Sequence, residues 1–250
     1  MNRQFFIVLT CLIFVVFSTS VSMASLAEGL IAYWPLDRDA NDNIGNHNGK
    51  LMGGASFVKD GERGEVLSID GNDGHVEIAH SPDLVFAPTD SFSIAVWLNI
   101  QTLPGHWAGI VTKSRDQSPW YGLWVTPSNQ WHFVGGQGGA NVRMDVGKAA
   151  TGWLHLAGVY DAATHTQTVY VDGKVIGEQN NVTIAASGAG DIWFGGAKSV
   201  NEYLKALIDD VLLYKRALDS GEIQDIASGV SILSVEPNAK LTTTWGAIKR

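Results

Sequence analysis

The stretch that says most about the fold is TVYVDGKVIG, at residues 168–177. β-branched and aromatic residues lie on both sides of the dipeptide Asp172-Gly173, which is the pattern of two antiparallel strands joined by a two-residue turn. Such a turn takes type I′ geometry, and its central residues need a positive φ that Asp followed by Gly tolerates. The stretch therefore predicts a β-hairpin.

Short apolar runs of the same kind continue on both sides of this hairpin, and Gly, Asn, Asp and Pro separate them. The chain contains 28 Gly and 10% aromatic residues, which fits many short strands joined by tight turns. So many strands in one domain favour two packed antiparallel sheets. The expected strand segments are 30–36, 65–70, 75–79, 92–100, 108–114, 120–126, 130–136, 153–161, 166–179, 191–197 and 206–214.

One segment, RALDSGEIQDIAS at 216–228, has the sequence of a helix. Asp219 is a good N-cap, and Glu222 follows three residues later, so the two form a capping box. Ile223 and Ile226 supply an apolar flank. The pattern predicts one short helix directly after the last core strand.

Residues 1–24 have the pattern of a secretory signal peptide. A positive start precedes an apolar run that is shorter than the ~20 residues of a membrane-spanning helix. Ser22 and Ala24 are the small residues expected before a cleavage site, so we predict cleavage after Ala24; the alternative is an uncleaved N-terminal anchor. Cleavage implies a protein that is secreted or held in the cell envelope, without membrane insertion. One domain is then expected at 25–229, followed by a polar tail at 230–250.

The charge balance narrows the classes of partner. The chain has 17 basic and 25 acidic residues, for a net charge of −8, and no cluster of Lys or Arg. This argues against nucleic acids and anionic membrane surfaces as partners. The only cysteine, Cys11, lies in the signal segment, so a disulfide is not expected. The acidic balance makes calcium the natural candidate for a structural cofactor.

Five blocks, in this order along residues 28–228, resemble the laminin-G-like, concanavalin A-like jelly-roll domains of secreted bacterial proteins. The resemblance implies an all-β fold, a two-sheet antiparallel jelly-roll sandwich. Such domains bind carbohydrate or protein, and many hold a structural calcium. Related sandwiches also include glucanases, so the fold alone does not assign a function. The blocks are AYWPLDRDANDNIGNHNGKL, VLSIDGNDGHVEI, FSIAVWL, WLHLAGVYDAATHTQTVYVDG and LIDDVLLYKRALDSGEI.

The acidic residues do not form the pattern of a glycosidase. Retaining enzymes on related folds place their carboxylates at alternate positions of one strand. Asp209 and Asp210 are adjacent, so on a regular strand they face opposite sides of the sheet. We therefore predict a non-catalytic binding module with no catalytic residue. The alternatives are a structural or adhesive envelope protein without glycan binding, and a glycoside hydrolase-related enzyme.

Asp209 lies in a strand with two apolar faces, so its carboxylate needs a buried partner. Backbone hydrogen bonds and calcium are both candidates, and the resemblance favours calcium at this position. Oxygen-rich turns at 36–46 and 70–74 offer further ligands, although such turns also stabilise themselves without an ion. The predicted calcium ligands are Asp37, Asn43, Asp73 and Asp209.

The tryptophans divide into two groups. Trp34, Trp97 and Trp153 belong to strand segments that the family shares, and we expect them in the core. In the segment WYGLWV, Tyr121 and Leu123 are expected to face the core.

That parity leaves Trp120 and Trp124 on the opposite surface, where sugar rings stack on aromatic platforms. Trp107 and Arg115 lie in adjacent segments. The predicted ligand-binding residues are Trp107, Arg115, Trp120 and Trp124, and the predicted ligand is a glycan or a cell-surface protein. Alternatively, these rings pack under a loop or a partner domain.

Overall fold

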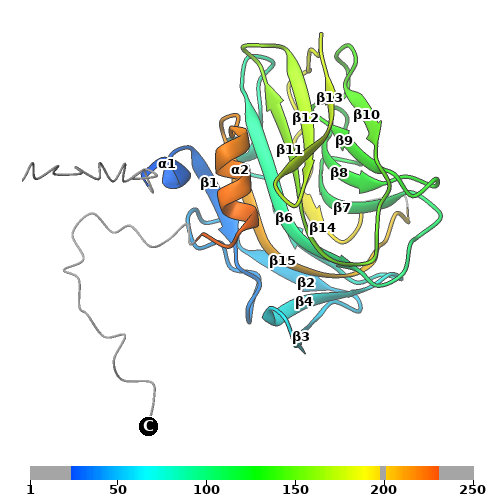
Figure 1. Cartoon of the computed structure of the whole chain (residues 1–250). Coiled ribbons are helices and arrows are strands. Elements are labelled where there is room, and N and C mark those ends of the chain that lie inside the picture. Colours follow the sequence, from blue (N-terminus) through cyan, green and yellow to red (C-terminus); the bar gives the residue numbers. More distant parts are fainter. Residues whose placement is uncertain (1–23, 198–200, 231–250) are drawn as a thin grey trace, which may run out of the picture.

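The computed structural model describes residues 24–197 and 201–230, and it shows the predicted jelly-roll sandwich of two antiparallel sheets (Figure 1). Sheet A has the strand order β13-β12-β11-β6-β15-β4-β3, and β1 pairs with β15. Its strands are β1 (Leu30–Trp34), β3 (Ser56–Asp60), β4 (Gly64–Asp70), β6 (Phe92–Ile100), β11 (Gly152–Asp161), β12 (Thr166–Val171), β13 (Lys174–Gln179) and β15 (Lys205–Tyr214).

Sheet B has the strand order β10-β9-β8-β7-β14-β5-β2. Chain neighbours such as β4 and β5 lie in different sheets, so the chain crosses repeatedly between the two layers. Its strands are β2 (Gly49–Met52), β5 (His75–Ile78), β7 (Ala108–Lys113), β8 (Tyr121–Val125), β9 (Trp131–Val134), β10 (Arg143–Val146) and β14 (Ile192–Phe194).

The predicted hairpin is confirmed. Strand β12 pairs with β13, and Asp172 and Gly173 between them have φ angles of 49° and 75°. Both values are positive, as a type I′ turn requires.

The main core lies between the two sheets. Strand β6 sends alternate side chains inward, and all of these are buried. Phe92 contacts the ring of Tyr121 at a centroid distance of 5.1 Å, which joins sheet A to sheet B. The inward set from β6 is Phe92, Ile94, Val96, Leu98 and Ile100.

Helix α2 (Ser220–Ala227) covers part of the outer face of sheet A beside β1 and β6 (Figure 1). The predicted capping box is present: the backbone N–H of Glu222 donates to Asp219, and that of Asp219 donates to the Glu222 side chain. Ile223 and Ile226 are buried against this face of the sheet. Two further short helices, α1 (Ala24–Ala27) and η1 (Pro82–Leu84), were not predicted.

Strands β2, β3 and β10 were also not predicted, and each of them is an edge of its sheet. An edge strand contacts a neighbour on one side only and is half exposed, so its sequence lacks a continuous apolar pattern. This agrees with the sequences GKLM, SFVKD and RMDV, which each carry at least one charged residue and of which only Met144 is buried.

Residues 1–23 of the predicted signal segment 1–24 and residues 231–250 of the predicted tail 230–250 lie outside the described residues. Within the described part, no helix is long and apolar enough to cross a membrane.

Candidate functional site

A cavity of about 110 Å³ lies on the outer face of sheet B, and all four residues predicted to bind a ligand line it. Trp107 precedes β7, Arg115 and Trp120 lie in the loop between β7 and β8, and Trp124 lies in β8. The fold thus brings together residues that the sequence only suggested as a set. Three further residues complete the lining: His132, Arg143 and Glu202.

Strand alternation explains how β8 contributes to this cavity. Tyr121 and Leu123 face the core, as predicted, and the Tyr121 hydroxyl donates to the Leu84 carbonyl oxygen at 3.0 Å. Trp124 therefore lies on the other face of β8, and Trp120, the residue before the strand, lines the same cavity. Trp124 is not displayed at the surface as expected, because only 2% of it is exposed.

Glu202 is the polar centre of the cavity. Its side chain accepts hydrogen bonds from Arg115 Nη2 at 2.9 Å and from Trp124 Nε1 at 3.0 Å. Both carboxylate oxygens are thus used by protein donors. This pairing fixes the Trp124 ring and the Arg115 guanidinium, so the wall of the cavity is held in place before any ligand arrives.

The aromatic side of the cavity is formed around His132. The edge of its ring meets Trp107 at a centroid distance of 4.9 Å and Trp124 at 6.0 Å. Asp145 contacts His132 Nδ1 and fixes the orientation of the ring. Burial lowers the pKa of His132, although Asp145 opposes that shift. Trp107 is 36% exposed and offers its ring to solvent.

Two guanidinium groups lie against Trp120. Arg115 Cζ is 4.5 Å from the ring centroid and Arg143 Cζ is 5.7 Å from it. These are cation–π distances. The cavity therefore combines aromatic faces with positive charge.

Sequence reasoning missed three lining residues for different reasons. Arg143 lies in the edge strand β10, whose four residues are too short a run for the alternation to stand out. His132 lies between the core residues Trp131 and Phe133 and pairs with Trp124, so the alternation in the segment 130–136 could have identified it. Glu202 follows a loop, and no local pattern points to it.

A second cluster lies on the outer face of sheet A around Arg63. Arg63 Nε donates to Asp209 at 2.7 Å, and Arg63 Nη2 donates to Asp210 at 2.6 Å. The Tyr33 hydroxyl also donates to Asp210 at 2.6 Å. The partner of Asp209 is therefore an arginine, which is neither of the two candidates that we expected.

The expectation that Asp209 and Asp210 face opposite sides was wrong. The pairing of β15 with β6 shifts between Asp209 and Leu212, and Asp210 has a φ of 46°. This irregularity breaks the alternation of the strand. Both carboxylates consequently reach the same guanidinium.

Trp97 and Trp153 were also expected in the core, and they lie outside it. Both are half-buried on the outer face of sheet A, where Arg63 Cζ is 4.2 Å from the Trp97 centroid and 5.5 Å from that of Trp153. Trp34 is in the core, 1% exposed, as predicted.

The four predicted calcium ligands do not meet at one place. Asp37 and Asn43 line a cavity of about 440 Å³ together with Asp39 and Glu65. Asp209 pairs with Arg63, and Asp73 accepts a hydrogen bond from the Gly54 backbone in another turn. Among the described residues, no three His, Cys, Asp or Glu side chains are grouped to hold a metal. The set as predicted does not fit one calcium ion.

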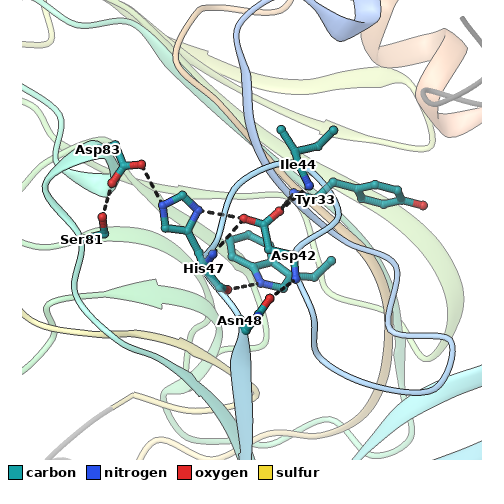
Figure 2. Close-up of polar contacts among 8 residues, drawn as sticks. Tyr33, Asp42, Ile44, His47, Asn48, Ser81 and Asp83 are labelled. Atoms are coloured by element: carbon teal, nitrogen blue, oxygen red, sulfur yellow. Dashed lines mark hydrogen bonds and ion pairs between the residues drawn. The ribbon is translucent and has the colours of Figure 1, made fainter. Parts of the chain in front are cut away.

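Several side-chain oxygens of the Asx-rich turns accept hydrogen bonds from backbone N–H groups of the protein. Asp42 accepts from the backbone N–H groups of Tyr33, Ile44 and His47 and contacts His47 Nδ1 at 2.8 Å (Figure 2). These hydrogen bonds lower the pKa of Asp42 despite its burial. Asp70 accepts three backbone hydrogen bonds in the second turn. Such turns are stable without an ion.

The family model of the concanavalin A-like lectin/glucanases superfamily, Laminin_G_3, matches residues 70–224. No curated protein sequence matches the chain. Solved structures with the same fold include domain 4 of AbnA, an extracellular arabinanase from Geobacillus stearothermophilus in complex with arabinotriose. Its TM-score is 0.63 at 20% identity, over 79% of this chain and 98% of that one.

Two other structures match smaller shares of larger chains. The binding domain of Paraclostridial Mosquitocidal Protein 1 has a TM-score of 0.64 at 15% identity, over 82% of this chain and 53% of that one. A Trypanosoma rangeli sialidase has a TM-score of 0.62 at 18% identity, over 83% of this chain and 34% of that one. At these identities the likeness concerns the fold.

Proposed function

This chain belongs to the concanavalin A-like lectin/glucanases superfamily, and from that premise we propose that it is an exported, non-catalytic module that binds carbohydrate in the sheet B cavity. The observation that carries the proposal is the convergence of Trp107, Arg115, Trp120 and Trp124 on one hollow.

The chemistry of the lining suits a sugar. Sugar rings present apolar C–H faces that stack on aromatic side chains, while their hydroxyls need fixed polar partners. Trp107 supplies an accessible ring, and His132 and the arginines supply polar groups. The known ligand of a structural neighbour, arabinotriose, is also a carbohydrate. An extracellular protein is the second candidate ligand, because the same rings would suit an exposed side chain.

A glycan array tests the proposal directly. We expect binding by the wild-type protein and a loss of at least ~10-fold in affinity for Trp107→Ala, because one stacked ring contributes on the order of 1–3 kcal/mol. Trp107 is partly exposed, so this variant should keep its fold. The matched control is Leu103→Ala, an exposed apolar residue that does not line the cavity. Absence of any glycan signal, with the melting temperature unchanged, would reject carbohydrate binding and favour a structural or adhesive role.

The non-catalytic part of the proposal rests on the state of the carboxylates. Asp209 and Asp210 are bound by Arg63, and Glu202 is bound by Arg115 and Trp124. A glycosidase needs two carboxyl groups that flank the scissile bond, and Glu202 is the one carboxylate among the residues that line the sheet B cavity. We therefore expect no reducing-sugar release above a heat-treated control, and measurable release would overturn this part.

Calcium keeps a place in the proposal only at the cavity of Asp37 and Asn43. The support is that the Asp37 carboxylate and the Asn43 amide line one cavity, since carboxylate and amide oxygens are the ligands that calcium prefers. An ion that binds only the folded state must raise the melting temperature. We expect a higher melting temperature in excess calcium than with a chelator, and a smaller increase in Asp37→Asn. Identical melting in the two conditions would remove calcium from the proposal.

A further inference from the structure

One arginine in the sheet B cavity has no carboxylate partner. Arg115 forms an ion pair with Glu202 at 2.9 Å. Within the described residues, Arg143 forms no ion pair, and its guanidinium only lies over Trp120 at 5.7 Å. Asp145, two residues along the same strand, is held by His132.

The charges of the lining follow from these contacts. The carboxylate of Glu202 compensates Arg115, and burial lowers the pKa of His132, which favours its neutral form. Arg143 therefore lines the cavity with a guanidinium that no described carboxylate binds, because Asp145, the carboxylate two residues along its strand, contacts His132 instead. The whole chain carries a net charge of −8. The protein as a whole therefore does not attract anions over long distances, and Arg143 acts on an anion only within the cavity.

Building on the proposed function, we infer that the ligand of this cavity is an acidic carbohydrate, whose ring stacks on the exposed tryptophan while an anionic substituent pairs with Arg143. A carboxylate or a sulfate on the sugar ring supplies the required chemistry. A guanidinium binds either group through two parallel hydrogen bonds, which fixes the orientation of the ring beside it.

The position of Arg143 supports this role over a purely structural one. Arg143 is exposed on the edge strand β10, and its contact with Trp120 is the longer of the two cation–π contacts on that ring. Trp120 is already covered by Arg115, so the fold does not depend on a second guanidinium there. Both arginines line one cavity together with aromatic rings.

The test compares three oligosaccharides of equal length by titration calorimetry at low salt. One is an oligogalacturonide, one is the neutral oligogalactose, and one is a sulfated oligogalactose. We expect at least one acidic oligosaccharide to bind ~10-fold more tightly than the neutral one, and added salt to reduce that preference. The two acidic arms distinguish a carboxylate from a sulfate.

Variants then assign the preference to Arg143. Arg143→Gln should bring the ratio of acidic to neutral affinity close to one, and Arg143→Lys should restore part of it through charge alone. The matched control is Arg38→Gln, which makes the same charge change at an exposed residue of the Asp37 cavity and should keep the preference.

Three results would overturn the inference and leave the proposed function standing: equal affinity for neutral and acidic oligosaccharides, a preference that survives in Arg143→Gln, or a preference that Arg38→Gln also abolishes. If glycan arrays likewise show no binding, both the proposed function and the inference are wrong.

Discussion

Two arginines in this protein lie against tryptophan rings and bind carboxylates, one on the outer face of each sheet. On sheet A, Arg63 stacks on Trp97 and Trp153 and neutralises Asp209 and Asp210. On sheet B, Arg115 stacks on Trp120 and binds Glu202.

The two clusters contain the same kinds of side chain, and the second lines a cavity. In the sheet A cluster two carboxylates bind one guanidinium, and Arg63 lies in the turn between β3 and β4. There, the arginine packs on the outer face of the sheet. In the sheet B cluster, Trp107 and Arg143 extend the lining beyond the ion pair and leave an opening. The comparison teaches that residue chemistry does not distinguish a structural cluster from a binding site, whereas an accessible hollow does.

The largest effect is expected at Arg63. Arg63→Met leaves two carboxylates without their cation, one of them almost fully buried, and removal of one partner of a buried ion pair costs ~3–5 kcal/mol. We expect the melting temperature to fall by about 10 °C, measured by calorimetry.

A second variant shows whether that loss comes from charge. Adding Asp209→Asn and Asp210→Asn to Arg63→Met removes the uncompensated charges, so part of the lost stability should return. If the triple variant is less stable than Arg63→Met alone, the carboxylates are not the cause, and the assignment of the sheet A cluster is wrong.

The tryptophans should separate the two clusters by function. Trp97→Ala removes a half-buried ring under Arg63, and we expect a loss of ~2–3 kcal/mol in stability with glycan affinity unchanged. Trp107→Ala should show the reverse, with reduced affinity and a melting temperature within ~2 °C of wild type. Each variant is measured by both calorimetry and glycan binding. Equal effects of both on stability would contradict the distinction.

A smaller effect on stability is expected at Arg115. Arg115→Met leaves Glu202 with its hydrogen bond from Trp124, and the cavity admits water to the freed oxygen. We expect a loss of ~1 kcal/mol in urea unfolding, well below that of Arg63→Met, together with weaker glycan binding. A loss as large as that of Arg63→Met would show that both arginines are structural.

The smallest effect concerns pH. Burial and the neighbouring Asp210 raise the pKa of Asp209 to about 7, so its contribution to stability is lost as the pH rises through 7. Burial lowers the pKa of His155 to about 4, so its contribution is present above pH 6.5 and is lost as the pH falls toward 4. These two contributions oppose each other between pH 4 and 7.

Replacing either Asp209 or His155 should reveal the pH dependence of stability that the other residue causes. His155→Phe also removes two buried ring nitrogens without partners, and we expect its melting temperature to rise by a few degrees from pH 8 to pH 5. In Asp209→Asn the melting temperature should fall over the same range. Parallel pH profiles for wild type and both variants would show that neither group titrates as its surroundings imply.

The sequence by itself determined the features that depend on neighbours along the chain. The alternation in the predicted strands, the Asp172-Gly173 turn and the Asp219 capping box are local patterns, and the structure confirms all three. The same alternation gave Trp124 the opposite direction to Tyr121 and Leu123 in β8, because side-chain direction in a regular strand depends only on parity, but it did not show that Trp124 is buried with the core cluster.

Tertiary structure decided what depends on residues far apart in sequence. Arg63 is the partner of Asp209 across 146 positions, and Glu202 reaches Trp124 across 78. The pairing of β15 with β6 shifts near Asp210, and for that one strand the alternation of side chains therefore does not hold. The edge strands and the position of Trp97 were not predicted for the same physical reason. The burial of a segment depends on which other segments pack against it, and the local sequence does not identify those segments.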